Sequence, residues 1–204
     1  MKGDITTIPG YQVCDYLLVL RPNDELWNRV MKIKEEYSDK FKNEHGRWSR
    51  PHIVLASFQQ YEMMEERLLS RLQTIAMGFP PFKVELKDYG NFPSHTIYIN
   101  ISSRVGVQNL VKKIRSEGQR LMKMEEGNKP LYMLEPHITI ATKLLPWQYE
   151  KGWLEYSHKY FTGRFIADSM YLLKRKAMDS KFHVSEKFTF QNLPVTIKQG
   201  ELFS

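Results

Sequence analysis

The stretch PHITIA, residues 136–141, is nearly repeated as PHIVLA at residues 51–56. Each copy has the apolar, β-branched composition of a short strand, interrupted by one imidazole at His137 or His52. A single histidine in such a strand is most often a structural residue that hydrogen-bonds within a packed sheet. Two histidines in the same frame, in a chain with six histidines, indicate instead that a duplicated unit has kept both for a shared chemical role.

The order of predicted elements around the two stretches is also repeated. Hydrophobic periodicity and turn residues predict a first series consisting of strand Val13–Leu20, helix Glu25–Phe41, a strand at residues 51–58, helix Met63–Met77 and strand Phe82–Leu86. The second series consists of strand Thr96–Ile101, helix Val107–Met124, a strand at residues 136–143, helix Trp147–Phe161, and a hairpin of Phe165–Leu173 with Phe182–Phe190. We therefore expect one domain over residues 1–204, whose halves, about 11–90 and 94–192, share one sheet system.

Composition and motif content argue against several classes of protein. The single cysteine, Cys14, cannot form an internal disulfide, and the Cys/His spacings of structural zinc sites are absent from the sequence. The sequence also lacks the HExxH, P-loop and GxGxxG patterns of zinc proteases, NTPases and dinucleotide-binding enzymes. Residues 1–10 lack the apolar segment of a signal peptide, and no apolar run approaches the roughly 18 residues of a membrane span. We therefore expect a cytoplasmic protein without membrane contact.

The charge balance favours a phosphate-bearing partner. Thirty Lys and Arg residues against 23 Asp and Glu residues give a formal net charge of +7 at pH 7. Such a charge attracts phosphates over long distances and raises their rate of encounter, but it carries no information about the fold.

Two imidazoles that face each other across a cleft supply what phosphodiester chemistry requires without a metal. A histidine, with an unperturbed pKa of about 6.5, acts as a general base when neutral and as a general acid when protonated. His52 and His137 would therefore exchange protons with the attacking and leaving oxygens, in an order that the residues alone leave open. Thr139 lies two positions after His137 and hence on the same strand face, where its hydroxyl can donate to a phosphoryl oxygen.

The doubled frame resembles the signature of a known superfamily. His-Ile-Val-Leu at residues 52–55 and His-Ile-Thr-Ile at residues 137–140 are similar to the paired His-x-Thr-x motifs of the 2H phosphoesterases. That superfamily includes LigT-like 2′,3′-cyclic phosphodiesterases and 2′-5′ RNA ligases, and the similarity in element order extends from about Val13 to Phe190. The resemblance implies an α+β, bilobal fold in which two pseudo-symmetric lobes, each with an antiparallel sheet and flanking helices, surround a central cleft.

The resemblance also implies an activity and a set of site residues. Members of the superfamily open cyclic phosphates or cleave 2′-5′ linkages on nucleotides or RNA ends, without a metal or other cofactor. Carried over residue by residue, His52 and His137 become the acid and base, and Thr139 becomes a phosphate ligand. The implied partner is a nucleotide or an RNA terminus, and we expect a monomer with no obligate protein partner.

Val54 departs from the signature, which has Thr or Ser two positions after the first histidine. Valine nearly matches threonine in shape but donates no hydrogen bond. Ser57 is expected to face the other side of the strand, because its offset from His52 is odd. LigT-like members often have an arginine where this chain has Thr142 and then Lys143, which leaves the role of that arginine open. Three interpretations follow: a slower phosphodiesterase, an enzyme whose substrate places its phosphate differently, or an RNA- or nucleotide-binding module without turnover.

Five further residues are candidates for substrate binding. They are Trp48, Arg50, Tyr132, Lys143 and Tyr171. Trp48 and Arg50 precede the first motif, where an indole could stack on a base and a guanidinium could meet a phosphate. The alternative is that these aromatic residues pack against their own fold, as is common in loops and strands. The basic run at residues 174–176 could guide an RNA end, or it could be a solvated turn.

Overall fold

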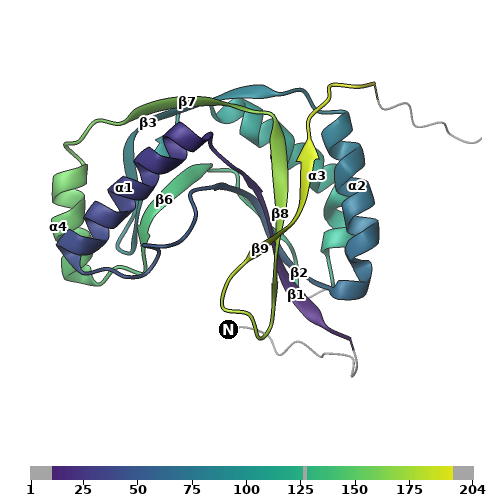
Figure 1. Ribbon diagram of the computed structural model, residues 1–204, viewed down its shortest axis with the longest axis horizontal. Coiled ribbons are helices and arrows are strands. Elements are labelled where there is room, and N and C mark those ends of the chain that lie inside the picture. The colour runs from purple at the N-terminus through teal and green to yellow at the C-terminus, as the bar shows by residue number, and fades with distance from the viewer. Residues whose placement is uncertain (1–10, 126–127, 195–204) are drawn as a thin grey trace, which may run out of the picture.

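A computed structural model describes residues 11–125 and 128–194 as an α+β molecule (Figure 1). Its elements are β1 (Val13–Leu20), α1 (Asp24–Phe41), β2 (Ile53–Tyr61), the 3-10 helix η1 (Glu62–Met64), α2 (Glu65–Met77), β3 (Phe82–Phe92), β4 (Thr96–Ile101), α3 (Arg104–Met122), β5 (Leu131–Tyr132), β6 (His137–Thr142), α4 (Pro146–Tyr156), β7 (Thr162–Ala167), β8 (Ser169–Lys176) and β9 (His183–Thr189). The expected fold class is confirmed. The expectation about a signal peptide concerns residues 1–10, which lie outside the described residues.

The nine strands of the described residues form one antiparallel sheet. Its order is β7-β3-β4-β6-β2-β1-β8-β9, and β5 pairs with β2 beside this path. Helices α1 and α4 pack against the half that contains β4, β6 and β7, whereas α2 packs against β9 in the other half and α3 packs against both β2 and β3 (Figure 1). The two halves meet between β2 and β6, where one residue pair, Ile53 with Ile138, joins them. The connection between the two halves of the sheet is therefore the shortest of its strand pairings.

The two halves of the sheet do not follow the two halves of the chain. The boundary expected between residues 90 and 94 falls inside the hairpin of β3 and β4, which pair directly. One half of the sheet contains β3, β4, β6 and β7, and the other contains β1, β2, β8 and β9. Each half of the sheet therefore contains strands from distant parts of the chain. The sequence did not predict this mixing, because the periodicity of a strand does not determine which strand it pairs with.

The strand expected at Phe165–Leu173 is in fact two strands that belong to different halves of the sheet. Asp168 separates β7, which pairs with β3, from β8, which pairs with β1 and β9. The Asp168 carboxylate accepts a hydrogen bond from Ser169 at 2.7 Å, and its carbonyl accepts one from the Phe190 amide at 2.8 Å. This residue thus fixes the bend at which the chain passes from one half to the other, visible at the top of Figure 1.

Helix α1 shows how the core is built and where it contains an exception. Its start is capped by Asn23, whose side chain accepts a hydrogen bond from the Leu26 amide at 3.2 Å. Its buried stripe has helical spacing and consists of Leu26, Val30, Lys34, Tyr37, Ser38 and Phe41. Lys34 is the charged member of this stripe, with 2% of its surface exposed.

None of the helices within the described ranges is long and apolar enough to cross a membrane.

Candidate active site

The two motif histidines lie on one face of the sheet, at the junction of β2 and β6. Ile53 pairs with Ile138 across this junction, and both isoleucine side chains are fully buried. Since side chains alternate along a strand, His52 and His137, one position before each isoleucine, project to the opposite face. Both histidines are partly exposed there.

The antiparallel register combines both motifs into a four-residue group, the histidine patch, made of His52, Val54, His137 and Thr139. When the register of the central isoleucine pair is extended by one step to either side, His52 comes level with Thr139, and Val54 comes level with His137. All four side chains are partly exposed. Burial lowers the pKa of His52, and the charge of a protonated His137 lowers it further.

A backbone carbonyl two residues upstream faces each imidazole, and it orients the ring of His137 through Nδ1. His137 Nδ1 lies 2.8 Å from the Glu135 carbonyl oxygen, which can only accept, so Nδ1 is the donor. His52 Nδ1 is buried, and the Arg50 carbonyl, likewise two residues upstream, raises the pKa of this imidazole without forming a full hydrogen bond. The Nε2 atoms are therefore the ring nitrogens left for acid and base chemistry.

The two imidazoles have different electrostatic surroundings. Burial lowers the pKa of both. The positive charges of Lys34 and His137 lower the pKa of His52 further, whereas the backbone and carboxylate of Glu135 raise that of His137. The surroundings of His137 thus favour the protonated form more than those of His52.

Aromatic rings form a wall beside His137. The His137 ring centroid lies 5.0 Å from that of Phe92 and 4.7 Å from that of Tyr98. Tyr98 pairs with Thr139 across β4 and β6, which places it on the face of the histidine patch. The Tyr98 ring packs against the backbone of Gly90. A Cβ at this position would come within 2.6 Å of Tyr98 Cε2, so the close approach requires glycine.

A β-bulge follows each histidine by three residues. In the first motif, Leu18 pairs with Ala56 and Val19 pairs with Val54, so Leu55 is the extra residue of β2. In the second motif, Ile97 pairs with Ala141 and Tyr98 pairs with Thr139, so Ile140 is the extra residue of β6. The repeat in the sequence is thus also a repeat in backbone shape.

The first bulge makes the prediction for Ser57 wrong. Leu17 pairs with Ser57 and Val19 with Val54, and Leu17 and Val19 share a strand face. Ser57 therefore lies on the face of Val54. The extra residue of the bulge turns Ser57 to the face on which His52 and Val54 lie, although Ser57 is an odd number of positions from His52.

The second bulge brings Thr142 to the same face as Thr139. Thr96 pairs with Thr142, as Tyr98 pairs with Thr139, so the two threonines of β6 share the face of their partners. The Thr142 hydroxyl lies 3.2 Å from that of Thr96, which in turn lies 2.7 Å from His95 Nδ1. The end of the second motif thus carries a pair of hydroxyls on the face of the histidine patch.

Lys34 is a residue of this region that motif patterns in the sequence do not indicate. Its Nζ donates to Ser49 Oγ at 2.6 Å and to the Thr139 carbonyl at 3.4 Å. Burial lowers the pKa of Lys34 to about 8. The signal in the sequence is its place in the apolar stripe of α1, between Val30 and Tyr37.

The candidates before the first motif lie in an exposed connection. Trp48 has 70% of its surface exposed, and the Arg47 guanidinium lies 5.0 Å from the centre of its ring. Arg47 is held by ion pairs to Glu35 at 3.3 Å and Asp39 at 2.5 Å. Arg50 is exposed. The structure therefore places both candidate side chains at the surface near the first motif.

Tyr132, Tyr171 and Lys143 lie in three different settings. Tyr132 pairs with the buried Ala56, and its hydroxyl lies 3.7 Å from Met122 Sδ on α3, so it points away from the histidine patch. Tyr171 pairs with Val19, which places it on the face of the patch, two strands from β2. Lys143 is exposed just after β6.

The basic run at residues 174–176 is neutralised by nearby carboxylates. Lys174 pairs with Glu62 at 2.8 Å and also with Glu65. Arg175 pairs with Asp15 at 2.6 Å, and Lys176 pairs with Glu62 at 3.0 Å. These ion pairs connect β8 to β1 and to the start of α2, which indicates a structural role.

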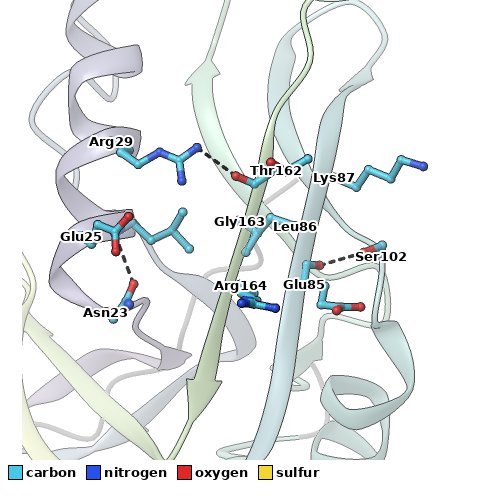
Figure 2. Close-up of a pocket in the computed structure, with 11 residues that line it drawn as sticks. Asn23, Glu25, Arg29, Glu85, Leu86, Lys87, Ser102, Thr162, Gly163 and Arg164 are labelled. Atoms are coloured by element: carbon cyan, nitrogen blue, oxygen red, sulfur yellow. Dashed lines mark hydrogen bonds between the residues drawn. The ribbon is translucent and has the colours of Figure 1, made fainter.

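A cavity of about 650 Å³ lies away from the histidines, between the start of α1 and strands β3 and β7 (Figure 2). Its lining carries both signs of charge, with Arg29 and Arg164 beside Glu25 and Glu85. Arg29 donates to the Thr162 carbonyl at 2.9 Å. This lining contains no imidazole, so the chemistry of the side chains, and not the size of a hollow, identifies the histidine patch as the candidate site. Among the described residues, no three His, Cys, Asp or Glu side chains are grouped so that they could hold a metal ion.

Comparisons with known proteins identify a family and a fold for this chain. The sequence model of the 2′-5′ RNA ligase superfamily matches residues 22–179. TT0787 of Thermus thermophilus has a TM-score of 0.63 at 16% identity, with 87% of this chain and 98% of that chain covered. E. coli LigT complexed with NADP+ has a TM-score of 0.56 at 14% identity, with coverages of 89% and 99%. E. coli LigT complexed with 3′-AMP has a TM-score of 0.58 at 13% identity, with coverages of 88% and 98%.

At these identities the structural likeness shows a shared fold. No curated protein matches the chain by sequence. The family match covers most of the chain and includes both histidine motifs. The chain therefore belongs to the 2′-5′ RNA ligase superfamily.

Proposed function

We propose that this protein is a phosphodiesterase that acts on a 2′,3′-cyclic phosphate or a 2′-5′ linkage of a nucleotide or RNA end, by general acid and base catalysis with His52 and His137. The observation that carries the proposal is the shared position of the two imidazoles. Both project from the same sheet face, and carbonyls near each Nδ1 leave each Nε2 for proton transfer.

The proposed reaction needs one proton acceptor and one proton donor. A neutral imidazole removes a proton from water as its oxygen forms a bond to phosphorus. A protonated imidazole gives a proton to the ribose oxygen as its bond to phosphorus breaks. The Thr139 hydroxyl, on the same face, donates to a non-bridging oxygen that gains charge in the transition state. Neither proton transfer requires a bound metal.

The nucleotide part of the proposal is supported by the aromatic wall and by the relatives. Phe92 and Tyr98 stand beside His137, where a base could stack on them. E. coli LigT is known in complexes with 3′-AMP, with ATP and with phosphate. The net charge of +7 would favour the approach of such phosphates.

A second candidate function is binding without turnover, and Val54 is the observation that favours it. Val54 lies on the face of the histidine patch, opposite His137, where the signature has a hydroxyl. One missing donor of this kind lowers rates by roughly 10²- to 10³-fold in oxyanion-type sites. Ser57 lies on the same face and offers a hydroxyl further along β2, so a loss of all activity does not follow.

The test is hydrolysis of nucleoside 2′,3′-cyclic phosphates and of 2′-5′-linked dinucleotides in the presence of a chelator. We expect His52→Ala and His137→Ala each to lower kcat by about 10²- to 10⁴-fold, because each removes one proton transfer. His158→Ala is the control, since His158 is exposed at the end of α4 and contacts the Leu154 carbonyl. Activity that survives either motif substitution would contradict the paired mechanism.

A further inference from the structure

A buried lysine lies directly behind the histidine patch. Lys34 has 2% of its surface exposed, although it projects from a helix whose neighbouring lysines, Lys32 and Lys40, are exposed. Two of its ammonium protons are donated to Ser49 Oγ and to the Thr139 carbonyl. No described carboxylate forms an ion pair with it.

An ammonium group buried without a counter-charge destabilises a fold, because it loses the solvation that water gave it. A lysine that served only to fill this place in the stripe of α1 would be replaced by leucine or methionine at no cost in packing. The chain has a charged group there instead. We therefore infer the role of this ammonium group from the atoms that surround it.

The ammonium lies where the two motifs separate from each other. Beyond the pair of Ile53 with Ile138, no further backbone pair between β2 and β6 is formed, and the Thr139 carbonyl accepts from Lys34. Ser49, its second acceptor, belongs to the connection that leads directly into His52. Lys34 thus contacts the backbone of the second motif and the connection that leads into the first motif.

We propose that Lys34 is a positioning residue that divides the work of the two histidines, so that His52 accepts the proton of the attacking water and His137 donates a proton to the leaving oxygen. This inference rests on the proposed function. It also gives the reaction a direction that the two nearly identical motifs do not provide by themselves.

The charged and titratable groups around each imidazole support this division. His52 is faced by Lys34 from α1, by His137 from β6, and by the Arg50 carbonyl, and the positive charges of Lys34 and His137 oppose protonation of its ring. His137 is faced by Glu135, whose carbonyl and carboxylate stabilise a proton on the ring. Tyr98 and Phe92 complete its surroundings and carry no charge near neutral pH.

The assigned step is balanced in atoms and charge. Water gives a proton to His52 Nε2, its oxygen bonds to phosphorus, and the bond from phosphorus to one ribose oxygen breaks. His137 Nε2 gives its proton to that ribose oxygen. The products are a phosphomonoester, a protonated His52 and a neutral His137, and proton exchange with water restores the starting state.

The test compares Lys34→Met with Lys32→Met, which removes the same charge from the exposed side of the same helix. In the protein without substrate, the ring protons of each histidine are followed by NMR against pH, with assignments from His52→Gln and His137→Gln. We expect Lys34→Met to raise the pKa of His52 and to leave that of His137 nearly unchanged. Lys32→Met should move neither.

The same variants are then assayed against pH on a nucleoside 2′,3′-cyclic phosphate. Lys34→Met should move the acidic limb of the kcat/KM profile to higher pH, by the same amount as the pKa of His52 rises. At a fixed pH on that limb, kcat/KM should fall tenfold for each pH unit of this shift. The alkaline limb, set by His137, should stay. Lys34→Arg, which keeps the charge, should restore the acidic limb, whereas a purely structural lysine would change activity equally at all pH values.

The outcomes separate the inference from the function on which it rests. If the wild-type protein turns over substrate but His52 titrates identically in all variants, the inference is overturned and the proposed function stands. The inference is also overturned if Lys34→Met moves the alkaline limb. If the wild-type protein turns over no substrate, both fail together, even where the titration of His52 has moved.

Discussion

Val54 and Thr139 are the residues at which the two motifs differ chemically. Val54 lies opposite His137 and is partly exposed, so a hydroxyl there would face the same space as that of Thr139. We expect Val54→Thr to raise kcat/KM on a nucleoside 2′,3′-cyclic phosphate by about 10- to 100-fold, as a donor is restored. Steady-state kinetics measures this gain.

The control for Val54→Thr is Val184→Thr, since Val184 is half-exposed on β9, at the edge of the sheet. This variant should leave the kinetics unchanged. Calorimetric titration with a nucleoside 3′-phosphate distinguishes the two candidate functions. A gain in affinity with no gain in turnover would favour the binding module.

Sequence patterns predicted the residues of the patch better than those that support it. His52, His137 and Thr139 stand out because the chemistry of a repeated strand is visible in a few adjacent letters. Lys34 does not stand out, because a lysine in an amphipathic helix normally faces water. Its burial depends on Ser49 and β6, which are distant in the chain and which periodicity cannot bring together.

At the scale of elements, the helices and most strands were predictable, whereas the short β5, the extension of β3 to Phe92 and the irregularities of the strands were not. Each strand has the composition and alternation of its class, so its type could be inferred locally. The bulges at Leu55 and Ile140 depend on the partner strand, and so does the bend at Asp168. Pairing decides all three, which is why Ser57 and the Phe165–Leu173 strand were assigned wrongly.

The hairpin of β3 and β4 carries the aromatic wall, and Gly90 gives it room. A Cβ at this position would lie 2.6 Å from Tyr98 Cε2 and 2.7 Å from Asn100 Oδ1. We expect Gly90→Ala to push the Tyr98 ring towards His137. The displaced ring should disturb the alignment of the substrate with His137 and lower kcat/KM by about 10-fold. The assay is hydrolysis of the same cyclic nucleotide.

Gly118→Ala is a suitable control, because a Cβ there meets the flexible end of Met122 at 3.3 Å within α3. Alanine should stabilise this helix by up to about 1 kcal/mol and leave the kinetics alone. The role of the wall would be disproved if Gly90→Ala lost stability in a denaturant titration but kept its full kcat/KM.

At the scale of the whole molecule, Lys34 makes stability depend on pH. Its pKa is lowered from 10.5 to about 8 by burial, so the folded state releases this proton more readily than the unfolded state does. Between these two values the unfolded state binds the extra proton, and the free energy of unfolding therefore rises with pH. The full rise corresponds to about 3 kcal/mol.

We expect wild-type protein to gain this stability, relative to Lys34→Met, as pH increases from 8 to 10.5. Urea denaturation at a series of pH values measures the difference, and Lys32→Met should follow the wild-type curve. Parallel curves for wild type and Lys34→Met would show that the ammonium is not desolvated in the folded protein.

The path of the chain through the sheet determines when the protein becomes complete during synthesis. Strands β8 and β9 are made last, yet they belong beside β1, in the half of the sheet that holds His52. A nascent chain that ends before residue 169 leaves one edge of β1 unpaired and α2 without its contacts to β9. Both histidines are translated well before that point, but the half of the sheet beside His52 is finished only when the last hairpin leaves the ribosome. Translation that stops early therefore yields a chain with every residue of the patch and an incomplete sheet beneath it.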